Sequence, residues 1–152
     1  MLSSNLGYPR IGQNRELKWL LESFWKKKIN EIDFFENISN IKKNNWAKQK
    51  KAGIHFIPSN DFSLYDHVLD MCLTVDAVPD RFKQLKNKKN KFDLYFAMAR
   101  GYQKGRIDIK AMEMTKWFDT NYHYIVPEFK PNQKFKLTFS WGKKRNIACS
   151  VE

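Results

Sequence analysis

Two stretches of the chain gather polar side chains of the kinds that bind anions or transfer protons. The first, GYPRIGQNRELK, ends in Arg15, Glu16 and Lys18. If a helix begins near Asn14, these residues fall in its first turn, where the helix dipole favours acidic groups and disfavours basic ones. Basic side chains beside free backbone N–H groups could share one anionic ligand. The alternative, two side chains that point into water, costs little, and chemistry alone favours it.

The second stretch is EMTKWFDTNYHYIVPEF, residues 113–129, which mixes polar groups with aromatic rings. Met114 to Phe118 is predicted as a strand, and Asp119, Asn121 and His123 follow it. Ligands collect at the C-terminal ends of strands in barrels and doubly wound sheets, so these groups could line a site. The residues alone support equally well a buried strand with its rings in the core. Those rings are Trp117, Phe118, Tyr122 and Tyr124.

A third candidate, Asp66 beside His67, resembles a catalytic pair only superficially. Adjacent side chains on a helix diverge, so they do not hydrogen-bond as a dyad does. A helix cap and a surface histidine account for the two residues. The sequence contains no HExxH, GxSxG, GxxxxGK[ST] or GxGxxG motif, so it gives no reason to expect a zincin, an α/β-hydrolase, a P-loop or a Rossmann enzyme. No residue is assigned a catalytic role.

Apolar spacing predicts the elements that must position these groups. A short strand around Ser4 to Tyr8 precedes a helix capped by Asn14. A second helix ends at Gly53, a residue suited to a left-handed C-terminal cap. The apolar residues of the two helices recur at helical spacing. They are Leu17, Leu20, Leu21, Phe24 and Trp25, followed by Phe35, Ile38, Ile41 and Trp46.

The pattern continues with IHFIP, residues 54–58, as a second strand. A third helix follows, a charged loop is expected over 79–91, and another helix over 92–102. KFKLTF, residues 134–139, is predicted as a further strand. The third helix has cap candidates before its apolar positions. The candidates are Asn60, Asp61 and Ser63, and the apolar positions are Leu64, Val68, Leu69, Cys72 and Leu73.

Alternating strands and helices predict an α/β fold with a parallel sheet. A complete (βα)8 TIM-type barrel takes ~250 residues, so 152 residues allow only a partial barrel of the first three to four βα units. Such a piece leaves a parallel sheet edge exposed. We therefore expect one incomplete domain.

Composition restricts the class of protein further. The 28 basic and 16 acidic residues give a net charge of +12, which raises nucleic acid as a partner. The excess is mostly lysine spread along the chain, however, not arginine concentrated on one recognition element. No apolar run approaches the ~20 residues that cross a bilayer, so we expect a cytoplasmic protein. Cys72 and Cys149 lack metal-site or disulfide spacing.

Four blocks together closely resemble the N-terminal domain of the cobalamin-independent methionine synthases. The family is also called 5-methyltetrahydropteroyltriglutamate homocysteine methyltransferase. The blocks are LGYPRIGQNRELKWLLESFW, KQKKAGIHFIPSNDFSLYDHVLDMCL, EMTKWFDTNYHYIVPEF and FKLT, which reach almost everything up to Thr138.

The resemblance implies two (βα)8 barrels, with the folate substrate between them and zinc and homocysteine in the C-terminal one. By position, the segment Arg15, Glu16, Leu17 and Lys18 is similar to the family's folate-contacting segment, and Lys116 to a second contact. The implied ligand is 5-methyltetrahydropteroyltriglutamate, whose tail of carboxylates suits an arginine and two lysines. The resemblance therefore favours a ligand site in both stretches.

The chain also departs from the family. The similarity covers residues 1–138, and residues 139–152 form a divergent tail. The family's zinc ligands have no match, and neither cysteine is one of them. We expect a truncated N-terminal piece that is inactive by itself, because zinc lowers the pKa of the reacting thiol. A complementary C-terminal chain is a further expected partner. The alternative interpretation is a small basic module that binds polyanions such as nucleic acid.

Overall fold

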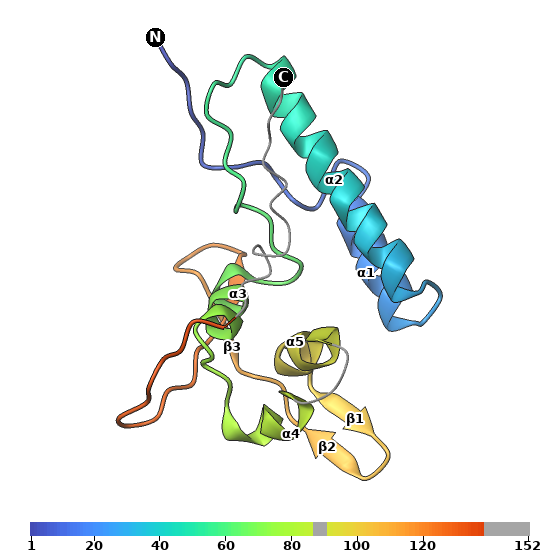
Figure 1. Cartoon of the computed structure of the whole chain (residues 1–152), viewed down its shortest axis with the longest axis vertical. Helices are drawn as coiled ribbons and strands as arrows, with labels where there is room; N and C mark the ends of the chain where they lie inside the picture. The colour runs from blue at the N-terminus through green and yellow to red at the C-terminus, as the bar shows by residue number, and fades with distance from the viewer. Residues whose placement is uncertain (87–90, 139–152) are drawn as a thin grey trace. The chain divides into compact units, whose positions relative to one another are not determined.

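The chain contains helices and small sheets, and it divides into two compact units. The computed structural model describes residues 1–86 and 91–138 (Figure 1). The first unit comprises Met1–Leu64, and the second begins at Tyr65. The mixture of helix and sheet confirms the predicted α/β class.

Two helices form most of the first unit. They are α1, Glu16–Trp25, and α2, Glu31–Lys51, which lie side by side (Figure 1). Phe24 of α1 stacks on Phe34 of α2 with 4.1 Å between ring centroids. Leu17 and Phe34 are fully buried. Both helices were predicted from apolar spacing. In α1, the buried Leu17 and Leu21 belong to the predicted apolar face. In α2, the predicted face was wrong except at Ile38, because the other buried residues are Phe34, Asn45 and Gln49.

The ends of the helices show where local signals succeed and fail. Gly53 has φ +80°, its N–H donates to Lys50 O, and the next N–H, that of Ile54, donates to Gln49 O. These bonds form a Schellman motif, which confirms Gly53 as the cap of α2. The prediction of Asn14 as the N-cap of α1 was wrong, because the capping position is occupied by Arg15, whose side chain makes no cap bond.

The two predicted strands of the first unit are reduced to one contact. Ser4 and Phe56 form an isolated parallel bridge, and Ser3 O accepts hydrogen bonds from the N–H groups of His55 and Phe56. Two segments alone form an unstable sheet in water, so the parallel pairing does not extend to the length predicted for either segment.

The described part of the second unit contains four helices and two hairpins. The helices are α3 His67–Thr74, the 3₁₀ helix η1 Asp80–Phe82, α4 Lys83–Lys86 and α5 Lys91–Arg100. The predicted loop over 79–91 was wrong where η1 and α4 lie, because Phe82 and Leu85 are buried and anchor a helical turn each. Residues 87–90 lie outside the described part. The cap of α3 is Asp66, which confirms the interpretation of Asp66 as a helix cap, and the three cap candidates upstream were wrong.

The strands of the second unit pair as antiparallel hairpins. β1, Tyr102–Lys104, pairs with β2, Ile107–Ile109. β3, Met114–Lys116, pairs with β4, His123–Ile125, in the register that sets Lys116 opposite His123. The strand predicted at Met114 therefore exists, but its partner is the next segment of chain and not a parallel strand.

The last predicted strand was also wrong over its described part. Residues 134–138 form no strand. They run along the end of α3, where the N–H groups of Lys136 and Thr138 donate to Val75 O and Thr74 O. Phe139 lies outside the described residues. In the described ranges, no helix is long and apolar enough to span a membrane.

Candidate functional site

Arg15 occupies an unusual backbone conformation at the start of α1. Its φ and ψ are 58° and 37°, in the left-handed region, which costs a residue other than glycine roughly 1–2 kcal/mol. The exposed guanidinium makes no hydrogen bond or ion pair within residues 1–86 and 91–138. Strain of this kind concentrates at functional positions. The structure thus presents a free cation at a helix N-terminus.

Glu16 holds the loop that leads into the helix. Its carboxylate accepts a hydrogen bond from Asn14 N at 3.2 Å. It also lies against Gly12, where an added Cβ would be 1.8 Å from Glu16 Oε2. An acidic group in this first turn is favoured by the helix dipole. Glu16 therefore shapes the approach to the segment, and Gly12 leaves the space that its carboxylate fills.

Leu17 and Lys18 point to opposite environments. The Leu17 side chain is fully buried, and its N–H donates to Ile11 O at 3.3 Å, so Leu17 anchors the segment. Lys18 is exposed; its ammonium lies 3.9 Å from Glu22 Oε1 and 5.0 Å from the centroid of the Trp19 ring. An exposed pair at this distance is weak, so a multiply charged anion can compete for Lys18.

Lys116 is the last residue of β3, in the second unit. Its side chain is exposed, and no acidic group pairs with it in the described part of the chain. The loop after it is closed by a 2.7 Å hydrogen bond from Trp117 N to Tyr122 O. Thr120 reinforces this turn by donating from Oγ1 to Trp117 O at 2.6 Å. Lys116 is thus an unpaired cation on an ordered hairpin.

The aromatic residues of this hairpin are not a buried core. Trp117 and Phe118 are 46% and 82% exposed, and Tyr122 is 43% exposed. Trp117 packs edge-to-face on Tyr124 at 5.2 Å between centroids. Phe118 has φ +51°, a strained value for an aromatic residue. The interpretation of these rings as core is therefore wrong, and they form an exposed aromatic surface.

Three polar residues predicted for this site lie on the same hairpin. Asp119 and Asn121 are exposed in the loop, and His123 begins β4. The His123 Nδ1 atom is 3.0 Å from Asn121 O, which orients the ring. Arg15, Glu16, Leu17 and Lys18 are thus together on α1 and its approach, while Lys116 and these polar groups are together on the β3–β4 hairpin.

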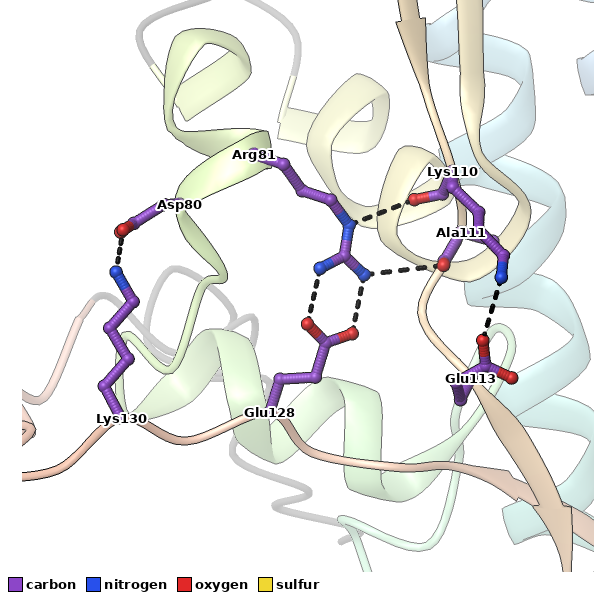
Figure 2. A network of polar contacts seen from close by, with 7 residues as sticks. All are labelled: Asp80, Arg81, Lys110, Ala111, Glu113, Glu128 and Lys130. Carbon is purple, nitrogen blue, oxygen red and sulfur yellow. Dashed lines mark hydrogen bonds and ion pairs between the residues drawn. The ribbon is translucent and has the colours of Figure 1, made fainter.

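The segment that follows β4 is held by Arg81 of η1 (Figure 2). Its guanidinium forms a bidentate pair with Glu128 and donates to the carbonyl oxygens of Lys110 and Ala111. The hydrogen bonds from Arg81 lower the pKa of the Glu128 carboxyl, and the pairing raises the pKa of the guanidinium. Sequence reasoning missed this pair because 47 residues separate its members.

A second contact that the sequence did not reveal joins the buried Asp66 to the β3–β4 hairpin. Asp66 caps α3 through Leu69 N, and the same carboxylate accepts hydrogen bonds from Tyr122 and from the Ile125 N–H. An aspartate three residues before a helical apolar position is a capping signal. The three cap candidates lie too far upstream because Leu64 was taken as the first apolar position of the helix.

Two further observations concern metals and thiols. Within the described ranges, no group of three or more histidine, cysteine, aspartate or glutamate side chains is placed to hold a metal ion. These residues therefore do not fit the zinc that the resemblance implies. Cys72 is buried and unbonded, and burial, together with Asp66, raises its thiol pKa to about 11. Cys149 lies outside the described residues.

By its fold, the chain is a mixed helix-and-sheet α/β protein. Residues 2–146 match the family described as "Cobalamin-independent synthase, N-terminal domain". The chain therefore belongs to the cobalamin-independent synthase family, and it matches the N-terminal domain of that family. The comparisons give no support to the alternative of a nucleic-acid-binding module.

Several relatives carry the name 5-methyltetrahydropteroyltriglutamate–homocysteine methyltransferase. The protein from Flavobacterium johnsoniae is 57% identical over 90% of this chain, and that from Cytophaga hutchinsonii is 57% identical over 89%. The protein from Dictyostelium discoideum is 47% identical over 90% of the chain. The matched region is 18% of the first two relatives and 20% of the third. The chain thus spans about a fifth of their length.

Proposed function

We propose that this chain binds the polyglutamate tail of 5-methyltetrahydropteroyltriglutamate, as the N-terminal part of a homocysteine methyltransferase. Arg15 and Lys18 bind tail carboxylates at the start of α1, and Lys116 binds from the β3–β4 hairpin. Glu16 and Leu17 hold the α1 segment in place. The relatives' names supply the ligand, and the family supplies the reaction to which it belongs.

One observation carries the proposal: the unpaired guanidinium of Arg15 on a residue held in the left-handed region. Among residues 1–86 and 91–138, five residues other than glycine have positive φ. Lys27 and Asp76 follow helix C-caps, and Asn132 is of a type that tolerates this conformation. The two that remain, Arg15 and Phe118, lie in the two segments proposed to bind the ligand. Strain at both is consistent with function.

The chemistry of the tail fits these groups. A triglutamate offers several carboxylates along a flexible chain, and each guanidinium or ammonium can donate charge-assisted hydrogen bonds to one of them. Arg15 and Lys116 have no acidic partner to give up in the described ranges, and the contact between Lys18 and Glu22 is weak. Binding therefore requires little loss of existing interactions.

The proposal assigns no step of methyl transfer to this chain. Zinc, when bound in the family, activates the homocysteine thiol, and the described residues do not fit that metal. A complementary polypeptide, which would complete a (βα)8 barrel begun by these elements, would contribute the reacting groups. The parallel bridge between Ser4 and Phe56 supports such a barrel, since it has the strand direction that a βαβ unit requires. We also propose that the chain is located in the cytoplasm.

The test is calorimetric titration of the whole chain with 5-methyltetrahydrofolate in its triglutamate and monoglutamate forms. We expect the triglutamate to bind about tenfold more tightly or better, and the difference to shrink as salt is added, because exposed ion pairs are screened. Equal affinities for the two forms at low salt would contradict the proposed function.

A further inference from the structure

The Asp66 carboxylate connects α3 to the hairpin that carries Lys116. Asp66 is buried, with only 2% of the residue exposed. Oδ2 accepts hydrogen bonds from Leu69 N at 2.9 Å and from Ile125 N at 3.2 Å. Oδ1 accepts from the Tyr122 hydroxyl at 3.1 Å. One carboxylate thus bonds to the first turn of a helix, to the backbone of β4 and to the loop before it.

A helix cap alone does not require this arrangement. A capping aspartate needs one oxygen toward the helix N–H groups and can leave the other in water. Here both oxygens are withdrawn from solvent, which is costly for a carboxylate unless each is bonded. The bonds that meet this cost come from Tyr122 and Ile125, and both belong to the β3–β4 hairpin. The hairpin is therefore attached to α3 at two points.

Lys116 depends on that attachment for its position. Its side chain has no partner in the described residues, so the backbone of β3 sets where the ammonium lies. β3 is paired only with β4 in the described sheet, with Lys116 opposite His123. His123 follows Tyr122 directly, and the Tyr122 carbonyl accepts the hydrogen bond from Trp117 N. Tyr122 is therefore one residue from the position opposite Lys116, and its carbonyl is bonded to the residue that follows Lys116.

We propose that Asp66 is a positioning residue, which holds the β3–β4 hairpin through Tyr122 and Ile125 and so places Lys116 for the glutamate tail. The inference rests on the proposed function, since it assigns a role in binding the same ligand. Asp66 itself does not contact the tail, and its effect on binding is transmitted by the hairpin.

The test compares two changes that each remove one hydroxyl. Tyr122→Phe deletes the hydrogen bond from the hairpin to Asp66 and leaves the cap of α3 intact. Tyr95→Phe is the matched control, because its hydroxyl donates to Asp70 of α3 at 2.7 Å and accepts from Tyr65 N at 2.9 Å. Each variant is titrated with the triglutamate and the monoglutamate, and amide hydrogen exchange is followed at Trp117 and Ile125.

We expect Tyr122→Phe to reduce the preference for triglutamate at least about threefold, the size of effect that one lost hydrogen bond produces. Affinity for the monoglutamate should not change, and exchange at Trp117 should accelerate. In the double variant with Lys116→Ala, the further loss should vanish, because the two changes act on one contact. Asp66→Asn should show the same selective loss in any preparation that remains folded.

Two results overturn the inference while the proposed function stands. One is an unchanged triglutamate preference in Tyr122→Phe when Lys116→Ala has lowered it. The other is an equal loss of triglutamate preference in Tyr122→Phe and Tyr95→Phe, which would show that both changes act by destabilising the second unit as a whole. A wild-type chain with no triglutamate preference contradicts the proposed function itself and removes the role of Asp66 in binding. Hydrogen exchange would still report whether Tyr122 anchors the hairpin.

Discussion

The guanidinium of Arg81 and the carboxylate of Glu128 form a bidentate ion pair that joins η1 to the segment following β4. Arg81 Nη2 lies 2.6 Å from Glu128 Oε1, and Nη1 bonds to Oε2 (Figure 2). Arg81 Nε also donates to Lys110 O at 3.2 Å. One side chain thus holds the connection between β2 and β3 and the chain beyond β4. The pair braces both ends of the β3–β4 hairpin.

The pair makes the stability of the second unit depend on pH. Hydrogen bonds from Arg81 lower the pKa of Glu128 below its ordinary value of 4.5. The contribution of this ion pair to the free energy of unfolding is therefore present above pH 4.5, and it is lost as the pH falls through the lowered pKa of Glu128. Glu128→Gln should cost about 1 kcal/mol near neutral pH, since the pair is partly exposed, and nothing in strong acid. Urea unfolding as a function of pH measures both values.

The control for that change is Glu113→Gln. Glu113 pairs with Lys110, but the two side chains are 71% and 84% exposed, so the pair contributes little. Its unfolding curve should follow the wild type at every pH. If the free energy of unfolding of Glu128→Gln instead differs from that of the wild type by the same amount from neutral to acid pH, then the bidentate pair contributes no pH-dependent stability.

Cys72 should be inert in the folded chain. Burial raises its thiol pKa to about 11, so almost no thiolate is present at pH 8. In Cys149→Ser, which leaves Cys72 as the only thiol, labelling by a disulfide reagent should be slow in buffer and rapid in urea. Rapid labelling in buffer, in a sample that unfolds cooperatively, would show that this part of α3 opens readily.

Leu17 should contribute to the stability of the chain as the buried anchor of the α1 segment. Its side chain is fully buried, so Leu17→Ala should lower the free energy of unfolding by about 2–5 kcal/mol. Ile32→Ala, on α2, removes a similar side chain that is 78% exposed and should cost less than about 0.5 kcal/mol. Thermal unfolding compares them. Equal free energies of unfolding for Leu17→Ala and Ile32→Ala would contradict the anchoring role.

The chain alone should form no methionine when mixed with zinc, homocysteine and 5-methyltetrahydrofolate triglutamate. The thiol needs a means of losing its proton near neutral pH, and the described residues do not fit the zinc that the resemblance implies for this step. Methionine is measured by chromatography against a sample without protein. Turnover above that background would place a reacting group within this chain.

Sequence patterns predicted the parts of this fold that depend on local physics. The apolar face of α1, the existence of α2 and the left-handed Gly53 follow from periodicity and from glycine's freedom at positive φ. The candidate site residues were named from the resemblance, since RELK and Lys116 stand in the matched blocks, and their role in binding stays a prediction. Arg15 was named in this way, although no local rule predicts a left-handed arginine before a helix.

Contacts between distant segments were beyond local rules. The bonds of Asp66 to Tyr122 and Ile125, and that of Arg81 to Glu128, join residues 47–59 positions apart. The antiparallel hairpin at β3 was missed because a strand's apolar pattern does not specify its partner. The helical turn around Phe82 and Leu85 was missed because charged neighbours obscure its two buried residues.

The most direct test of the account compares the triglutamate affinities of Arg15→Ala and Lys43→Ala. Each change removes one positive charge from an exposed position, but Lys43 lies on α2 and is assigned no contact with the ligand. The account predicts that Arg15→Ala weakens triglutamate binding about tenfold while monoglutamate binding and Lys43→Ala stay near the wild type. Lys18→Ala and Lys116→Ala should behave as Arg15→Ala does. Equal losses in Arg15→Ala and Lys43→Ala, or equal losses for the two ligands, would contradict it.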